Sequence, residues 1–219
     1  MELPEFKRVL VWGGWYRLAH ASLGFATLVL LLTGWLIADS PTLAESAQDV
    51  HYIASALLIF GLAVRIVLMF AGKEHERFSA LFPATTELAA MAATLRFYIS
   101  LGRMPMPGWY AQNPLWKPVY LVVYLVLLLL VITGATMSAD TIFMGFYLPS
   151  VHEFWAQFML WFCLFHIASV IMHDYKKQTA DISAMVNGYR LFLIERGRSA
   201  AGVDIPVQVI TLDSLERHD

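Results

Sequence analysis

The sequence VHEFWAQFMLWFCLFHIASVIMHD at residues 151–174 decides the expected fold. From Phe154 to His173 it contains no Asp, Glu, Lys or Arg, and about 20 apolar residues are enough to cross the hydrocarbon core of a bilayer. It also contains histidines, and ionisable side chains inside a membrane are costly and usually mark function. The stretch therefore predicts a membrane-spanning helix whose histidines have a role.

The rest of the chain indicates a protein with several membrane spans. Of its 219 residues, 58% are hydrophobic and 15% are charged, whereas soluble domains carry about 25% charged residues. The mean hydropathy is +0.60. This composition excludes a disordered chain and a coiled coil, and it argues against a soluble enzyme. We expect four spans, at residues 16–38, 50–72, 116–139 and 151–174.

Composition also excludes several kinds of site. A single cysteine rules out a disulfide framework, a Cys-rich zinc site and a protein-bound iron–sulfur cluster. The net charge of −2 gives no basic surface for nucleic acid. The N-terminus lacks the short apolar region and small-residue cleavage site of a signal peptide, so we expect the first span to be retained.

The segment between the second and third spans differs from the spans. From residue 82 to 102 apolar residues follow helical spacing on one side, and the charged residues lie largely off that stripe, which is typical of an amphipathic helix at the membrane interface. The expected fold class is all-α: an integral membrane four-helix bundle with this interfacial helix between spans two and three. We expect one domain, residues 1–219, whose polar tail from 175 to 219 forms at most a short strand at 205–212.

The basic residues predict the orientation in the membrane. Lysines and arginines precede span one, lie between spans two and three, and follow span four. The loops at residues 39–49 and 140–151 contain none. Because basic loops stay on the cytoplasmic side, we expect both termini and the middle loop to be cytoplasmic.

Four histidines fall at two depths of this bundle. His20 lies near the cytoplasmic end of span one, while His51 and His152 open spans two and four on the outer side. His166 lies 14 residues after His152, which returns the side chain to within about 40° of the same helix face, about 21 Å along the axis. His51 is therefore expected to face His152 near the outer surface, and His20 to face His166 near the inner surface.

Two opposed histidines are a suitable ligand pair for a haem iron, with one axial nitrogen from each helix. A single histidine inside a membrane is more often a hydrogen-bonding group between helices. Four histidines in two pairs at matching depths favour two haems stacked across the membrane as an electron path. Ligation by two histidines leaves no open position on the iron, which suits electron transfer.

Other residues fit the same arrangement, each with a simpler alternative. Arg65 follows His51 by 14 residues and is expected either to bind a haem propionate or to extend to the inner headgroups. Arg17 is a second propionate candidate, or only a positive-inside charge. Spans one and three both end in a Thr-Gly pair, and Gly34 and Gly134 are expected to admit the outer haem or to pack helices. The Thr hydroxyl of each pair can bond within its own helix.

The inner end also offers polar groups for a quinone. His173 follows His166 by seven residues and competes with it as the inner ligand. Its position at the membrane edge, beside Asp174, favours contact with a propionate or a quinone instead. The expected quinone contacts are Asn113, His173 and Asp174.

Short motifs along residues 8–190 carry a family resemblance. They are Arg17-Leu-Ala-His20, Val50-His51-Tyr52-Ile53-Ala54, Arg65, Ala71-Gly72-Lys73-Glu74-His75-Glu76-Arg77, Asn113-Pro114-Leu115, His152, Trp161, His166, Asp174 and Gly188-Tyr189-Arg190. In these motifs the chain resembles the b-type cytochrome subunit of respiratory nickel–iron hydrogenases and, more distantly, the gamma subunit of formate dehydrogenase.

The resemblance implies a function. In that family the subunit lies in the bacterial inner membrane and anchors a periplasmic hydrogenase made of an iron–sulfur small subunit and a large subunit. It passes electrons through haem b groups to quinone and carries no catalytic residue of its own. By position, His20, His51, His152 and His166 match the haem ligands. The chain departs from the family at Ala21, where tryptophan is usual, and in the middle cytoplasmic loop, so the partner enzyme is less well defined than the haems.

Three alternatives stay open. The same anchor role serves other periplasmic oxidoreductases, such as thiosulfate reductase or formate dehydrogenase. A free-standing di-haem cytochrome would exchange electrons between quinone and a small diffusible partner. A transporter or proton channel would line its pathway with the histidines, but the spans lack the paired carboxylates or broken helices that such pathways often use.

Overall fold

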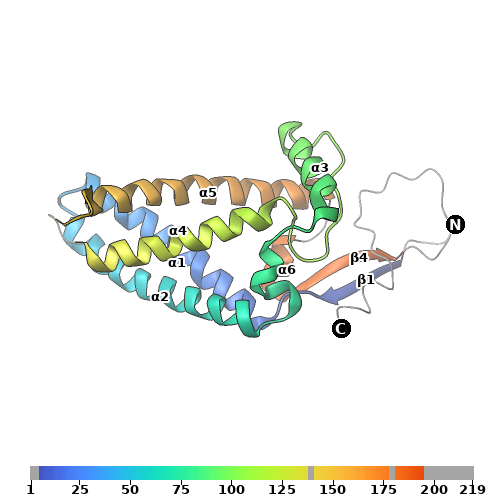
Figure 1. Cartoon of the computed structure of the whole chain (residues 1–219), viewed down its shortest axis with the longest axis horizontal. Coiled ribbons are helices and arrows are strands. Elements are labelled where there is room, and N and C mark those ends of the chain that lie inside the picture. The colour runs from blue at the N-terminus through green and yellow to red at the C-terminus, as the bar shows by residue number, and fades with distance from the viewer. Residues whose placement is uncertain (1–4, 138–140, 178–180, 195–219) are drawn as a thin grey trace.

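The computed structural model describes residues 5–137, 141–177 and 181–194. Long α-helices run along its longest axis (Figure 1): α1 (Gly14–Asp39), α2 (Ala44–Ala71), α4 (Trp116–Thr136) and α5 (Leu148–Lys177). Each contains one of the expected spans or most of it. Prolines 118 and 149 fall in the first turns of α4 and α5, where a missing backbone N–H breaks no helical hydrogen bond.

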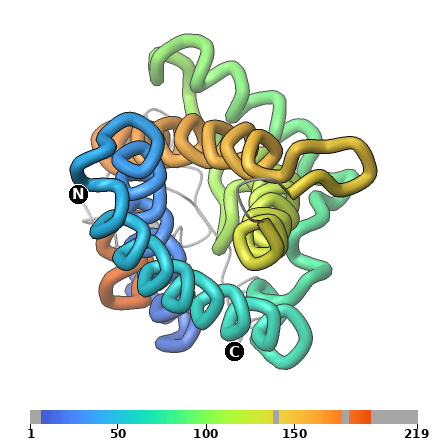
Figure 2. Tube along the Cα trace, turned by 90° about the vertical axis from the view of Figure 1, so that its left-hand side faces the viewer, coloured from blue at the N-terminus to red at the C-terminus, as the bar shows by residue number. Residues whose placement is uncertain are grey.

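These helices form two antiparallel pairs. α1 packs along α2 and α4 packs along α5, and fewer contacts join one pair to the other (Figure 2). The buried core of the bundle is apolar and consists of Ala26, Leu58, Leu62, Val123, Val126, Leu127 and Met159. Many large apolar side chains face outward instead, among them Phe25, Trp35, Ile53, Phe70, Leu125 and Phe165. An apolar exterior of this extent suits lipid as the surrounding solvent.

A glycine sets the close approach of α1 and α2. A Cβ at Gly61 would lie 3.0 Å from the Cβ of Ser22 and 3.2 Å from the carbonyl oxygen of Ala19. Small residues at such contacts let two helix backbones approach closely, which increases van der Waals packing in a membrane.

Five segments within the described ranges are long and apolar enough to cross a membrane. Four are the long helices, and the fifth is Phe78–Ile99, with a mean hydropathy of 1.2 against 1.7 to 2.5 for the others. This fifth segment is not one continuous helix, because two 3₁₀ turns, η2 (Phe78–Leu81) and η3 (Thr85–Glu87), precede α3 (Leu88–Ile99). α3 lies beside one end of the bundle (Figure 1).

Two small antiparallel sheets are absent from the sequence-based expectation. β1 (Glu5–Leu10) pairs with β4 (Tyr189–Ile194), and β2 (Ile142–Phe143) forms a hairpin with β3 (Phe146–Tyr147). The structure is thus mostly helical, as expected, but each end of the helix bundle carries a two-stranded sheet, so the fold is not all-α. The expected tail also contains α6 (Asp181–Asn187), whereas the strand considered at 205–212 lies outside the described residues.

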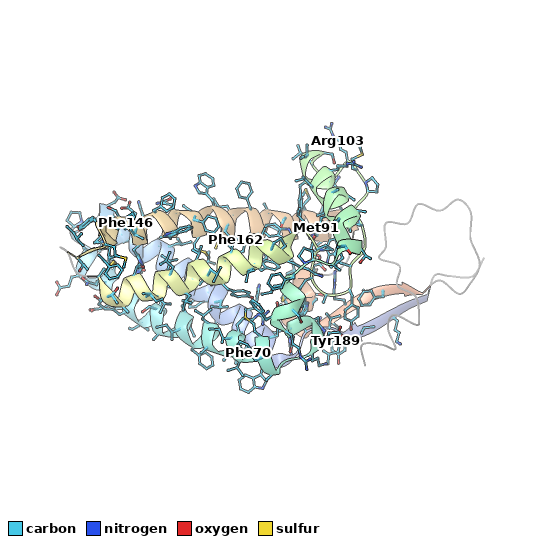
Figure 3. All side chains as sticks on the ribbon, in the orientation of Figure 1. Phe70, Met91, Arg103, Phe146, Phe162 and Tyr189 are labelled. Atoms are coloured by element: carbon cyan, nitrogen blue, oxygen red, sulfur yellow. The ribbon has the colours of Figure 1, made fainter. Side chains whose placement is uncertain are left out.

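β1, β4 and α6 form a cap at the same end of the bundle as α3. Figure 3 shows Arg103 and Tyr189 at this end and Phe146 at the opposite end. The cap has its own buried cluster, made of Val11, Trp12, Tyr16, Ala184 and Phe192. Because Tyr16 belongs to α1, this cluster fixes the cap to the start of the bundle.

A substitution that adds one methyl group at Gly61 tests whether this close contact between α1 and α2 stabilises the protein. We expect Gly61→Ala to lower the stability of the protein by about 1–3 kcal/mol, because the added Cβ meets α1 backbone and side-chain atoms that cannot all move away. The matched control is Gly24→Ala, since a Cβ at Gly24 has nothing within 4 Å. Thermal unfolding in detergent would measure both, and equal stability of the two variants would contradict the prediction.

Candidate functional site

His51 of α2 and His152 of α5 face each other at the end of the bundle that carries the β2–β3 hairpin. Their ring centres lie 6.4 Å apart, and the ring planes are inclined by 58°. Both side chains are half-buried. One ring therefore comes from each of the two helix pairs, and together they define the outer pair.

His20 of α1 and His166 of α5 form a second pair, the inner pair, nearer the capped end. Their ring centres lie 6.2 Å apart, with the planes inclined by 54°. His20 is exposed, while His166 is half-buried, stacks on Phe162 and meets the ring of Trp116 edge-on. The Nδ1 atom of His166 is buried and has no hydrogen-bond partner among the described residues. The structure thus brings together the two histidine pairs that the spacing predicts.

A threonine holds each ring of the outer pair. Oγ1 of Thr33 lies 2.8 Å from Nδ1 of His51, and Oγ1 of Thr133 lies 2.8 Å from Nδ1 of His152. Each hydroxyl also lies 2.8 Å from the carbonyl oxygen one turn earlier in its own helix. The sequence predicted the bond within the helix but not the bond to the histidine.

The glycine after each threonine lies beside an imidazole, and Gly134 leaves the ring of His152 space that a Cβ would crowd. A Cβ at Gly34 would lie 3.8 Å from Cε1 of His51, and a Cβ at Gly134 would lie 3.2 Å from Cε1 of His152. At both positions the group beside the glycine is the ring of a histidine on another helix. The Thr-Gly repeat therefore serves the outer pair directly.

Arg65 is 2% exposed and does not extend toward the surface. Its Nε donates to the hydroxyl of Tyr124 at 3.0 Å, and its Nη1 donates to the carbonyl oxygen of Glu76 at 2.7 Å. Its Nη2 is buried without a partner in the described part of the chain. Arg17 is similar, since Nη1 donates to the carbonyl of Val186 and the buried Nε has no partner within the same ranges. Both side chains thus have an N–H group available for an anion.

His173 lies in a polar cluster next to the inner pair and does not face His20. Its side chain is 4% exposed, and its Nε2 lies at hydrogen-bond distance, 2.6 Å, from the hydroxyl oxygen of Tyr98. The same hydroxyl oxygen accepts from Nε1 of Trp116 at 2.7 Å and from Nδ2 of Asn113 at 3.5 Å. Of the two candidates on α5, His166 is the one that the structure brings to His20.

An aspartate of α6 completes this cluster. Oδ2 of Asp181 lies 3.6 Å from Nδ1 of His173, and Oδ1 lies 2.5 Å from Nη2 of Arg190. Burial by itself raises the pKa of Asp181, but the hydrogen bond from His173 and the charge of Arg190 outweigh it and lower the pKa below its ordinary value. Asp174 accepts the backbone N–H groups of Asp181 and Ile182 at 2.6 and 3.0 Å, which caps α6.

The three expected quinone contacts therefore all have partners within the chain. Besides its bond to Tyr98, Asn113 accepts the backbone N–H of Leu115 at 3.0 Å. The sequence did not single out Tyr98 or Asp181 as polar partners at this end. No local signal was available, because these bonds join segments that are far apart along the chain.

Residues 11–188 match the family described as prokaryotic cytochrome b561. The chain belongs to this family. It is 25% identical over 219 aligned positions to a probable Ni/Fe-hydrogenase B-type cytochrome subunit of Cupriavidus necator, with 86% of this chain and 89% of the relative covered. It is also 25% identical over 211 positions to a protein of the same name from Azotobacter vinelandii, with 82% and 87% covered. No solved structure gives a significant match. The resemblance predicted from the sequence is confirmed.

Membership of a cytochrome b family implies a b-type haem, and the two histidine pairs fit such a group. Metal–imidazole bonds of about 2.0 Å, with about 1.1 Å from each nitrogen to its ring centre, would separate two ring centres by roughly 6 Å. The pairs lie at 6.2 and 6.4 Å. Within the described ranges no three His, Cys, Asp or Glu side chains gather around a possible ion, so a macrocycle would have to supply the other ligands.

The lowered pKa of Asp181 predicts an acid-sensitive cap. Its carboxylate is bound in the folded state, so its contribution to stability is complete above the ordinary pKa of about 3.9. That contribution is lost as the pH falls from this value through the lower folded-state pKa. We expect amide hydrogen exchange in α6 and β4 to increase over this range, and Asp181→Asn to show the increase already at neutral pH. Asp39→Asn, at an exposed site in the other half of the bundle, is the control, and unchanged exchange in α6 at low pH would contradict the prediction.

Proposed function

We propose that this chain is the membrane cytochrome subunit that anchors a periplasmic nickel–iron hydrogenase and passes its electrons through two haem b groups to quinone. The observation that carries the proposal is the presence of two opposed histidine pairs at two levels of one helix bundle. The names of the relatives, Ni/Fe-hydrogenase B-type cytochrome subunits, support the hydrogenase as partner. Within that partner, the iron–sulfur small subunit is the proposed electron donor and the large subunit the proposed site of hydrogen chemistry.

The proposed axial ligands are His51 and His152 for the outer haem and His20 and His166 for the inner haem. When bound, haem would supply one-electron redox chemistry at its iron. The four imidazoles, carried by three helices, would provide two ligand nitrogens to each haem iron. With both axial positions occupied by histidine, the iron would have no open position for oxygen, and the site would serve electron transfer.

Other residues would complete these sites. Gly34 and Gly134 border the outer pair and leave its rings unobstructed. Arg65 and Arg17 are proposed to bind propionates of the inner haem, since each has a buried nitrogen without a partner among the described residues. A charged guanidinium in a membrane interior needs an anion, and a carboxylate matches its geometry.

We place the quinone at the inner end, near Asn113, His173 and Asp174. Each of these groups makes a hydrogen bond within the chain, so a quinone bound there would share or displace one of them. We propose that the quinone displaces the hydroxyl of Tyr98 from His173. This hydroxyl bonds to both His173 and Trp116, and the ring of Trp116 contacts His166, so a quinone in its place would lie close to the inner pair.

For the membrane topology we propose one domain, residues 1–219, in which α1, α2, α4 and α5 cross the bacterial inner membrane. α3 has 12 residues and spans about 18 Å, well short of the hydrocarbon core of about 30 Å, so it would lie at the interface. Both termini would be cytoplasmic, because the loops that contain no Lys or Arg lie at the end with the outer pair.

Single substitutions separate the two proposed haems. We expect His152→Ala to remove the outer haem and keep the inner one, and His166→Ala to do the reverse, because each variant loses one axial nitrogen. Reduced-minus-oxidised visible spectra with quantified haem would measure this on the purified protein. His173→Ala is the matched control on the same helix and should retain both haems.

The outcomes discriminate clearly. Wild-type protein without b-type absorption would end the haem proposal. Two haems in both His152→Ala and His166→Ala would show that the pairing is wrong, and loss of the inner haem in His173→Ala alone would exchange the assignment within α5.

The orientation has its own test. A reporter that is active only in the cytoplasm, fused after Asp219, should be active, because basic residues follow α5 and are absent from the loop between α1 and α2. The same reporter inserted in that loop, after Thr42, should be inactive. Activity at Thr42 and none at Asp219 would reverse the proposed orientation.

A further inference from the structure

The two threonines that bond to the outer pair can affect the electronic properties of the histidine rings as well as their position. We propose that Thr33 and Thr133 are positioning residues that fix the tautomer of His51 and His152 and make these imidazoles stronger donors. The outer haem would then have a lower reduction potential than the same ligands would otherwise give it. This inference rests on the proposed function, because it concerns residues proposed as haem ligands.

The hydrogen bonds around each threonine determine the tautomer. A hydroxyl has one hydrogen, and the carbonyl oxygens of Val29 and Leu129, each 2.8 Å from the corresponding Oγ1, can only accept it. The hydroxyl oxygen must then accept from the histidine, so the proton of the neutral ring lies on Nδ1. Nε2 keeps its lone pair free for a metal. The same logic holds on both helices, and the bond within the helix also restricts rotation of the threonine side chain.

A hydrogen bond at Nδ1 changes the donor strength of the ring. When Nδ1–H donates to an acceptor, electron density on the imidazole rises and Nε2 becomes a more basic ligand. A more basic axial ligand stabilises ferric iron relative to ferrous iron, which lowers the reduction potential. Two threonines act on the two rings of one pair, so their effects should add.

The inner pair lacks this arrangement at His166. Its Nδ1 is buried and has no hydrogen-bond partner in the described part of the chain, and its ring is surrounded by Phe162, Trp116 and Tyr120. The threonines therefore lower the potential of the outer site alone and leave that of the inner site unchanged. A lower potential at the outer site favours electron flow from the outer to the inner level, toward the proposed quinone side.

The experiment uses the haem-loaded protein and removes only the hydroxyl. Thr33→Val and Thr133→Val keep the shape of the side chain, and we expect each to shift the midpoint potential of one haem component to a more positive value, with the other component unmoved. Thr33→Ser should restore the wild-type potential. The matched control is Thr136→Val, because Thr136 makes the same bond within its helix, to Ile132 at 2.8 Å, and bonds to no histidine among the described residues.

Two further measurements test the role of the threonines without a midpoint potential: nitrogen-15 NMR of the histidine rings and the amount of haem that each variant retains. In the reduced, diamagnetic protein labelled with nitrogen-15 histidine, Thr33→Val and Thr133→Val should each shift the Nδ1–H resonance of one ring of the outer pair relative to wild type, because that N–H loses its acceptor, whereas Thr136→Val should leave both resonances unchanged. Loss of the outer haem in Thr33→Val together with its retention in Thr33→Ser would also support the positioning role.

The failures of the two proposals are distinguishable. Wild-type protein without haem would refute the proposed function. Wild-type protein with two haems whose potentials do not change in the valine variants, or change equally at both haems, would overturn the role of the threonines and leave the proposed function intact.

Discussion

A polar side chain inside a bilayer must find its partners within the protein, because the lipid offers none. The four paired histidines of the bundle meet this constraint in two different ways. At the outer level, a threonine from the neighbouring helix satisfies one nitrogen of each ring, and Gly134 lets the ring of His152 come close. At the inner level, aromatic rings surround His166 and leave its Nδ1 without a partner among the described residues. The ring centres of the two pairs lie 6.2 and 6.4 Å apart, a separation that would admit one metal ion between the rings of each pair.

The charged residues at the capped end obey the same constraint. Arg65 and Arg190 are each 2% exposed, and they donate hydrogen bonds to carbonyl, hydroxyl and carboxylate oxygens of the chain. Arg190 joins Asp181 of α6 to the carbonyl oxygen of Tyr110, in the loop before α4. Breaking such a buried pair costs more than the pair contributes, because one charge is left without compensation. The cap therefore combines an apolar cluster with a buried ion pair whose two partners depend on each other.

Sequence reasoning was most successful where the signal was local. Runs with no charged residue, or with Arg65 alone in α2, located α1, α2, α4 and α5, although α2 begins at Ala44 and not at the predicted residue 50. The interval of 14 residues between His152 and His166 placed these two histidines at two levels of one helix. The end of α4 was predicted at residue 139 but falls at Thr136, because Met137 is extended, with ψ of 144°. Haem ligation by the four histidines stays a prediction.

Contacts between distant segments were beyond sequence reasoning. The bond from His51 to Thr33 depends on how two helices are rotated about their axes, which the spacing of residues does not specify. The β1–β4 sheet joins strands of six residues from near the two ends of the described chain, and neither strand has a partner close in sequence. The Phe78–Ile99 segment shows a further limit, because length and composition alone make it a possible span, whereas its 3₁₀ turns divide it.

The pairing of β1 with β4 has a mechanical consequence for the bundle. β1 leads directly into α1, and β4 follows α5 through α6, so the sheet links the two helices that carry the inner histidines. α1 and α5 touch each other at few points along their length. The sheet thus acts as a crosslink outside the membrane segments, which limits how far the two helices can separate without filling the space between them. Such a link keeps His20 and His166 at a high effective concentration for each other, although their helices share few contacts.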